Sequence, residues 1–307
     1  MRSARAGIFC AGILFAAFAA SPARAVEPAP ASENEAVKRG AYIFHAAGCK
    51  ACHTDIKKKG PPLAGGRAIG TPFGVFFGPN ITPDPVTGIG EWSDGDFIRA
   101  LRSGISPDGD HYYPVFPYTS FTKMTDRDML DLKAYIFSLP PVNKPNRPHE
   151  VNFPFGFRFL LGFWKMLHFT PGTFKPDPVK SAELNRGTYL AKALGHCAEC
   201  HSPRTMTGGL DLSKWMAGTV DGPDGETIPN VTPHKATGIG EWDLVDIELA
   251  LETGIKPDGD VLGSLMGEVI DETTSHLTPA DRRAIALYLK SLAPIDNRVE
   301  VEDENRD

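Results

Sequence analysis

Two short stretches of the 307-residue chain contain cysteine and histidine residues at a spacing that could hold a cofactor. Residues 49–53 read Cys-Lys-Ala-Cys-His, and residues 197–201 read Cys-Ala-Glu-Cys-His. On a helical turn, positions i, i+3 and i+4 lie on one face. In each stretch, two thiols and one imidazole can therefore point toward the same group.

The Cys-x-x-Cys-His spacing is the attachment signature of c-type haem. Four thiols are available for thioether bonds to two porphyrins, and these are Cys49, Cys52, Cys197 and Cys200. His53 and His201 then ligate the two irons from the proximal side. A zinc site usually needs a second cysteine or histidine pair, and a thioredoxin-type redox pair needs a βαβ context. Neither accompanies these motifs, so the sequence predicts two covalently bound haem c groups.

Residues 1–25 have the pattern of an export signal. Arg2 and Arg5 precede an apolar run at residues 7–20, and a small-residue cleavage site ends at residue 25. The run is short and rich in alanine, which disfavours a retained membrane anchor. We therefore expect the signal to be cleaved and the protein to be exported to the periplasm.

The charge of the chain bears on its partners. The formal net charge is −6, and loss of the signal removes three arginines and no acidic residue, which lowers it to −9. A surface of this sign disfavours nucleic acid as a partner. It favours a protein partner with a basic docking surface.

The sequence contains an internal repeat. The matched segments are 39–43 with 186–190, 80–83 with 230–233, 87–92 with 237–242, and 108–110 with 258–260. They occur in the same order in both halves, at offsets between 147 and 150 residues. Such a repeat indicates a duplicated domain with one haem motif in each copy.

The elements of each copy are predicted to be helices joined by glycine- and proline-rich loops, which gives an all-α fold. A first helix is expected from about residue 33 to residue 47, leading into the haem motif. Ser93 with Asp96 forms a capping box for a second helix, and Thr125 and Thr278 begin the closing helices. The predicted organisation is a signal peptide at 1–25, domains at 33–142 and 181–295, a proline- and aromatic-rich linker at 143–180, and an acidic tail at 296–307.

These motifs, together with Tyr-Pro-Val-Phe-Pro-Tyr at residues 113–118, resemble the class I cytochrome c family. The resemblance is closer to dihaem members related to the cytochrome subunits of membrane-associated alcohol, aldehyde and gluconate dehydrogenases. It implies two tandem class I cytochrome c domains and haem attachment outside the cytoplasm. It also implies that the first and last helices of each domain cross at a small residue and an aromatic one, here Gly40 with Tyr135 and Gly187 with Tyr288.

A proximal histidine leaves one axial position on each iron. Methionine in that position raises the reduction potential and closes the iron to substrates. The resemblance places the distal ligand of the second haem at Met266, which lies 65 residues after His201. A role for Met266 as an apolar loop residue is the alternative. Met216 lies ahead of residues 230–233 and is less suitably placed.

The first half departs from this pattern. Counted from the Asp-Gly-Asp landmark, Phe116 occupies the position equivalent to Met266, and phenylalanine cannot ligate iron. Met124, just ahead of the closing helix, is the best remaining donor, and we predict it as the distal ligand, with a core role as the alternative. Met129 has the helical spacing of a core residue. His111 is a further candidate that would lower the potential relative to methionine.

The linker contains an unusually aromatic segment at residues 153–169. Arg158 and Lys165 within it make it a poor transmembrane span. We favour an inter-domain strap that buries its aromatic side chains against both domains. The alternatives are an amphipathic segment in a membrane interface and a docking surface for a dehydrogenase subunit.

The predicted function is electron transfer by a dihaem c-type cytochrome. Electrons are expected to arrive from a periplasmic dehydrogenase of the flavin, quinone or molybdenum type and to leave to a cytochrome or oxidase. No residue needs to act as an acid, base or nucleophile. The alternative is a peroxidase-like dihaem enzyme, because the first half lacks methionine at the usual position.

Overall fold

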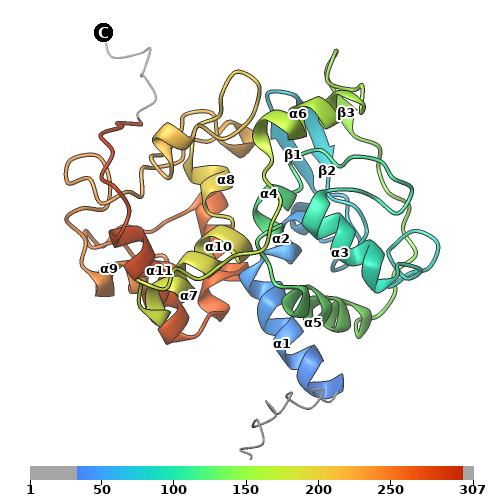
Figure 1. Cartoon of the computed structure of the whole chain (residues 1–307), viewed down its shortest axis with the longest axis horizontal. Helices are drawn as coiled ribbons and strands as arrows, with labels where there is room; N and C mark the ends of the chain where they lie inside the picture. The colour runs from blue at the N-terminus through green and yellow to red at the C-terminus, as the bar shows by residue number, and fades with distance from the viewer. Residues whose placement is uncertain (1–32, 300–307) are drawn as a thin grey trace, which may run out of the picture. The chain divides into compact units, whose positions relative to one another are not determined.

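The two haem motifs follow the first helix of each half. The computed structural model describes residues 33–299 (Figure 1). Helix α1 (Glu33–Ala46) leads into the short helix α2 (Cys49–His53). The helix expected from about residue 33 to residue 47 is therefore confirmed. The predicted signal at residues 1–25 and most of the tail at 296–307 lie outside the described residues.

The second half begins with α7 (Ala182–Tyr189), which continues as a π-helical turn at Leu190–Leu194. Helix α8 (Ala198–His201) follows and carries most of the second motif. The remaining helices are α3 (Asp94–Ser103), α4 (Tyr118–Phe121), α5 (Asp126–Phe137), α6 (Leu160–His168), α9 (Leu244–Thr253), α10 (Ser264–Glu272) and α11 (Pro279–Lys290).

Side-chain caps set the starts of the longer helices. Ser93 and Asp96 form a reciprocal capping box at the start of α3. Thr125 caps α5 by accepting a hydrogen bond from the backbone of the third helical residue, and Thr278 caps α11 in the same way. The predicted starts of these three helices are confirmed, because capping depends on residues adjacent in sequence.

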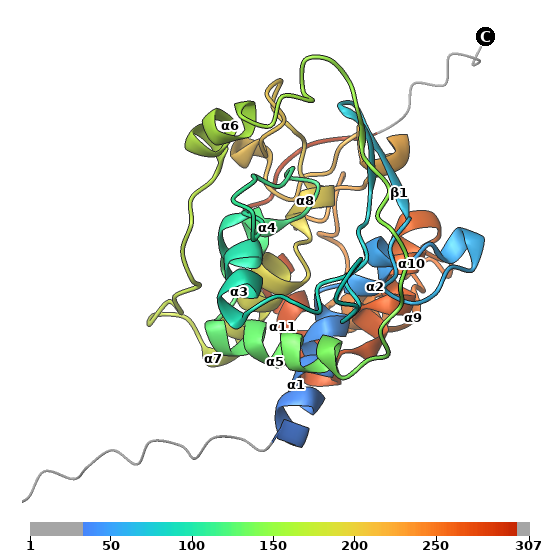
Figure 2. The same ribbon diagram turned by 90° about the vertical axis from the view of Figure 1, so that its right-hand side faces the viewer.

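The first and last helices of each half pack closely together. At Gly40 in α1, a Cβ atom would lie 1.9 Å from the carbonyl oxygen of Asp131 and 2.8 Å from the Cβ of Tyr135. At Gly187 in α7, it would lie 1.8 Å from the carbonyl oxygen of Ala284 in α11. Only glycine allows the backbones this close. Both views place α1, α5, α7 and α11 at the same end of the described residues (Figures 1 and 2).

The predicted helical fold is confirmed, but the first half also contains a small antiparallel sheet, so the fold is not purely α-helical. Strands β1 (Ala68–Thr71) and β2 (Gly74–Phe77) form a tight hairpin, and β3 (Glu150–Val151) from the linker pairs with β2. The sequence around the hairpin is rich in glycine, a composition that favours a loop over a strand. The third strand is only two residues long, and its pairing joins segments far apart in the chain.

The linker also differs from the prediction. It crosses both halves, but the expectation that its aromatic side chains are buried is wrong, since Phe153 is 85% and Phe163 is 62% exposed. The buried face of α6 is already occupied by Leu161 and Lys165. No helix among residues 33–299 is long and apolar enough to cross a bilayer.

The helices of the two halves share a hydrophobic core. Buried side chains of α1, α5, α7 and α11 belong to one continuous cluster. Residues 33–299 lie within one compact unit. The two-domain division at 33–142 and 181–295 therefore stays a prediction, although each half repeats the same sequence of helices.

Candidate haem-binding sites

The first motif lies on α2, where Cys49, Cys52 and His53 occupy one helical turn. The Nδ1 atom of His53 lies 2.8 Å from the carbonyl oxygen of Pro79. A carbonyl oxygen only accepts hydrogen bonds, so Nδ1 carries the proton in this pair. Nε2 then keeps its lone pair, which is the form of imidazole that ligates a metal.

The second motif has the same arrangement. The Nδ1 atom of His201 lies 2.9 Å from the carbonyl oxygen of Pro229. The backbone oxygens of the two histidines also have matching partners, because the oxygen of His53 accepts from Gly65 and that of His201 from Gly218. His53 and His201 are thus oriented by equivalent backbone groups.

The loop that carries each of these prolines is tied down by a buried asparagine. Asn80 donates from Nδ2 to the carbonyl oxygen of Val142 at 2.8 Å, and its Oδ1 accepts from Thr82 at 2.7 Å. Next to Pro79, Gly78 has no room for a side chain, because a Cβ atom would lie 1.9 Å from the carbonyl oxygen of Cys52. The repeated Asn-x-Thr-Pro stretch therefore fixes the loop against the motif.

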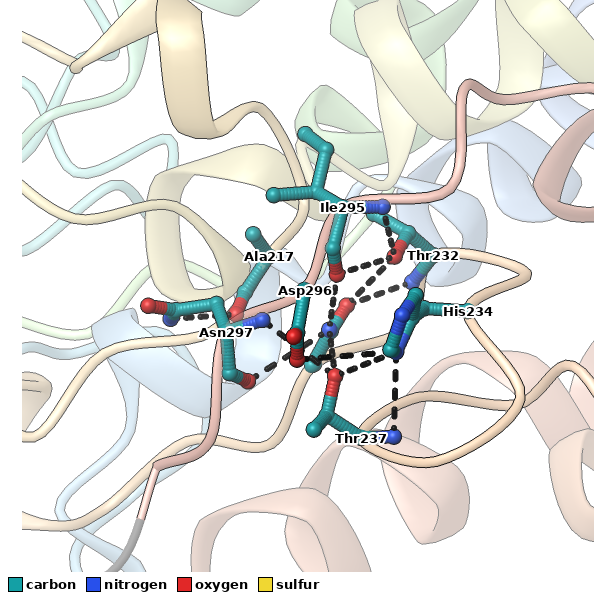
Figure 3. A network of polar contacts seen from close by, with 8 residues as sticks. Ala217, Thr232, His234, Thr237, Ile295, Asp296 and Asn297 are labelled. Atoms are coloured by element: carbon teal, nitrogen blue, oxygen red, sulfur yellow. Dashed lines mark hydrogen bonds and ion pairs between the residues drawn. The ribbon is translucent and has the colours of Figure 1, made fainter.

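The same network recurs in the second half (Figure 3). Asn230 donates to the carbonyl oxygen of Ile295 at 2.8 Å and accepts from Thr232 at 2.7 Å. Asn297 adds a hydrogen bond of 2.8 Å to the carbonyl oxygen of Ala217. The chain that leaves the closing helix thus clamps the loop that orients the proximal histidine.

The four motif cysteines fit thioether attachment. None of the four forms a disulfide, and each is partly exposed. Burial raises the pKa of Cys49 to about 12 and that of Cys197 to about 11, so both thiols are neutral at physiological pH. Residues 33–299 contain no group of three or more His, Cys, Asp or Glu side chains able to hold a metal ion by themselves. This donor set matches a haem site better than a zinc site.

The motif cysteines of the two halves lie near each other. Burial raises the pKa of Cys200 to about 12, with further contributions from the charges of Glu199 and Cys52. Cys52 and Cys200 are therefore near enough for their charges to interact. Groups bound to the two motifs would therefore be neighbours.

Each half places the helix that precedes its closing helix beside the haem motif of the other half. These helices are α10 in the second half and α4 in the first. In α10, Glu272 forms an ion pair of 2.8 Å with Lys50 of α2, and Glu268 forms one of 2.7 Å with Arg67. Conversely, Thr119 of α4 donates to the carboxylate of Glu199 in α8 at 2.6 Å.

A reciprocal pair of tyrosines joins the halves near the helix starts. Tyr42 donates to Asp281 at 2.5 Å, and its oxygen accepts from the backbone of Thr278. Tyr189 in turn donates to Asp128 and accepts from the backbone of Thr125. Each tyrosine thus completes the cap of the closing helix in the opposite half.

The methionines occupy different environments. Met266 is partly buried in α10, whereas Met124 is 0% exposed and enclosed in the shared core. The backbone bonds between residues 112 and 104 and between residues 262 and 254 preserve the 150-residue offset, which supports the equivalence of Phe116 with Met266. The assignments of Met124 and Met266 as iron ligands stay predictions.

The other candidate donors have partners within the protein. The sulfur of Met129 lies 3.8 Å from Nη2 of Arg102. The backbone nitrogen of Met216 donates to Ser202, next to the second motif, as does that of Leu63 to Thr54 in the first half. Met216 therefore occupies the position in the second half that Leu63 occupies in the first. Nδ1 of His111 lies 2.9 Å from the amine of Lys165.

Comparison with known proteins shows the family. Residues 37–140 match the family model for cytochrome c. Over 262 residues, the chain is 44% identical to a protein from Cereibacter sphaeroides named diheme cytochrome c-type, which covers 84% of this chain and 86% of that protein. The chain belongs to the cytochrome c family. As a cytochrome c, it carries covalently bound haem c with iron.

Other relatives of this cytochrome c are named as subunits of dehydrogenases. It is 36% identical over 298 residues to the cytochrome c subunit of alcohol dehydrogenase (quinone) from Komagataeibacter europaeus, across 91% of this chain and 61% of that protein. It is 38% identical over 275 residues to the fructose dehydrogenase cytochrome subunit of Gluconobacter japonicus, across 88% of this chain and 55% of that protein. The chain thus spans most of the dihaem relative but only part of these two.

The residues that orient the proximal histidines were not predicted from the sequence. Pro79 and Pro229 act through their backbone oxygens, which no side-chain pattern reveals. A signal was nevertheless present, because each proline directly precedes the repeated Asn-x-Thr-Pro stretch. The reciprocal contacts of Tyr42 and Tyr189 were also missed, although both tyrosines lie in the first repeated segment.

Proposed function

We propose that this cytochrome c is a dihaem electron carrier with two tandem class I domains, at residues 33–142 and 181–295. When bound, haem c supplies reversible one-electron redox chemistry. The observation that carries the proposal is the placement of both motifs at the contact between the halves, where Lys50 of the first motif pairs with Glu272 and Glu199 of the second accepts from Thr119. Neighbouring haems favour rapid transfer between them.

We further propose the ligand set of the two irons. His53 and His201 bind proximally, with their rings held by Pro79 and Pro229 through bonds that keep Nε2 available. Met266 and Met124 bind distally. Met266 is partly buried, whereas Met124 is fully buried in the shared core.

The donor of electrons in this proposal is a periplasmic dehydrogenase subunit of the flavin, quinone or molybdenum type, and the acceptor is a respiratory cytochrome or oxidase. Support for the donor comes from relatives named as cytochrome subunits of fructose and gluconate dehydrogenases. Support for the location comes from the export pattern of residues 1–25. The chain itself relays electrons, and the partner subunit carries out the oxidation of the substrate.

The test is to isolate the protein from the periplasm and measure covalent haem per polypeptide. Two haems are expected, with two one-electron steps in a redox titration. The double variant C197A/C200A should retain one haem, and so should C49A/C52A. Fewer than two covalent haems in the unmodified protein would contradict the assignment.

A second candidate function, a peroxidase-like enzyme with an open first haem, is favoured by two observations. Phe116 stands where the second half has Met266, and Met124 is fully buried. Carbon monoxide added to the reduced protein separates the two functions. A carrier with both irons closed leaves the spectrum unchanged, whereas an open first iron gives a carbon monoxide complex at one haem per polypeptide.

A further inference from the structure

The linker presents a series of large apolar side chains to solvent, which we call the apolar ridge. Its members and their exposed fractions are Phe153 (85%), Phe157 (51%), Phe159 (66%), Phe163 (62%), Met166 (82%) and Leu167 (74%). The rings of Phe153 and Phe157 are 6.1 Å apart, and those of Phe157 and Phe159 are 6.0 Å apart. An exposed apolar surface of this kind marks an interaction site.

The opposite face of α6 is held firmly by the first half of the protein. The amine of Lys165 donates to the carbonyl oxygens of Ser103 at 2.7 Å and Gly104 at 2.8 Å, where α3 ends. Leu161 packs in a small cluster with Phe76 and Tyr113. These contacts leave the apolar ridge pointing away from the core.

The second half holds the same helix from another side. The indole nitrogen of Trp164 donates to the carbonyl oxygen of Thr207 at 2.9 Å, and Nε2 of His168 lies 2.8 Å from the hydroxyl of Thr207. At Gly209, a Cβ atom would lie 2.1 Å from Nδ1 of His168. The helix is thus fixed to both halves. Both views place α6 at the end opposite α5 and α7 (Figures 1 and 2).

The charges around the apolar ridge distinguish it from the rest of the chain. Between Glu150 and Asp177 there is no acidic residue, although the chain as a whole has a net charge of −6. Arg158 and Lys175 are exposed in this segment. An aromatic segment with exposed cations and no acidic residue of its own complements an anionic lipid headgroup layer.

The shortage of polar groups favours lipid over protein as the occupant. Protein interfaces commonly form about one hydrogen bond per 100–200 Å². All six members of the apolar ridge lack side-chain hydrogen-bonding groups, apart from the weakly accepting sulfur of Met166. Acyl chains need no such groups.

We propose that the apolar ridge inserts into the interfacial layer of an anionic bilayer and holds this cytochrome at the membrane surface as a peripheral protein. On α6, Phe163, Met166 and Leu167 have the i, i+3, i+4 spacing of one helical face, and they enter the acyl boundary. Arg158 and Lys175 lie at the headgroups. Lys165 and Leu161 remain buried against the first half and fix the apolar ridge to the rest of the protein.

The test is co-sedimentation of the full-length haem-loaded protein with vesicles of phosphatidylethanolamine and phosphatidylglycerol. The triple variant F163S/M166S/L167S should lower the partition coefficient by about tenfold or more. The control V86S/V245S/V261S removes exposed apolar side chains elsewhere and should bind as the unmodified protein does. Covalent haem content and circular dichroism establish that each variant is folded.

Further variants in the same vesicle assay test the proposal. The variant R158Q/K175Q should lose affinity for anionic vesicles but not for phosphatidylcholine vesicles. If the triple variant does not fold, the single variants M166S and L167S, each at a highly exposed position, are measured in its place. Unchanged vesicle binding by the ridge variants would overturn the proposal. The proposal would also be overturned if the ridge variants bound vesicles normally but were reduced more slowly by a dehydrogenase. That result would show that the surface docks a protein.

Discussion

In the first half of this cytochrome, the loop after the Asp-Gly-Asp turn carries Phe116, whereas the same register in the second half carries Met266. The proximal sides, by contrast, match closely, with histidine-to-proline distances of 2.8 and 2.9 Å. In the proposed ligand set, the proximal side is constrained by two thioether bonds and one iron ligand on a single helical turn. The distal side has no such constraint, so the two halves can differ there.

The contacts between the halves show a second difference. Asp281 in α11 receives both Arg186 and Tyr42. In α5 these roles are divided, since Tyr189 donates to Asp128 and Arg39 to Asp131. Asp281 therefore makes two contacts that are divided between Asp128 and Asp131 in the first half.

The largest expected effect is the loss of one haem. C49A/C52A and C197A/C200A each remove both thioether bonds at one motif, so covalent haem should fall from two per polypeptide to one. Because α2 and α8 lie at the contact between the halves, both variants should also unfold at lower temperature. Haem staining of a denaturing gel and absorbance measure the first effect. Equal loss of both haems from either variant would show that the sites assemble as one unit.

The distal methionines should respond differently to truncation. M266A removes a partly buried side chain, so it should open the second iron to carbon monoxide with little loss of stability. M124A removes a fully buried side chain and should cost about 2–5 kcal/mol of unfolding free energy, in addition to opening the first iron. Carbon monoxide spectra and urea unfolding distinguish these effects. If the unmodified protein already binds carbon monoxide at one haem, Met124 is not the ligand.

Substitution of the carboxylates at the contact between the halves is expected to lower the unfolding free energy by a smaller amount. D281N weakens two charge-assisted or short contacts and should cost about 2 kcal/mol, whereas D128N should cost about 1 kcal/mol because it affects Tyr189 alone. Urea unfolding at neutral pH measures both. Y42F and Y189F, which remove only the hydroxyls, are the matched controls. Equal losses from D281N and D128N would show that Arg186 contributes nothing to stability.

The smallest expected effect is a pH dependence from Lys165, which belongs to the first-half contact of α6. Burial lowers the pKa of Lys165 from 10.5 to about 8. Between these values the unfolded chain keeps the proton and the folded protein releases it, so stability rises with pH through this window. The pKa of the neighbouring His111 is lowered by burial and that of Tyr118 is raised, so neither titrates there.

The variant K165M lacks this titration and is the reference. Stability of the unmodified protein relative to K165M should rise from pH 8 to pH 10 and stay constant below pH 7. Urea unfolding at fixed ionic strength checks the difference. A difference that does not change with pH would place the charge of Lys165 in water rather than against the carbonyl oxygens of α3.

Local features were predictable from the sequence. The helix starts at Ser93, Thr125 and Thr278 depend on a side chain and a backbone group three residues apart. Pairing of β2 with β3 was not predictable, because two residues of the linker carry too weak a pattern to indicate a strand. The exposure of Phe163 was not predictable either, since an aromatic run indicates a buried core unless the facing surface is known.

The sequence by itself determined the chemistry of this protein, because two cysteines and a histidine on one helical turn dictate what each motif can bind. It also determined the internal repeat and the main helices, which follow from short-range spacing and capping. Only the tertiary structure decided which methionine is only partly buried, which prolines orient the histidines and which face of α6 remains outside. These features depend on backbone oxygens and packing partners from distant parts of the chain, which no local pattern encodes.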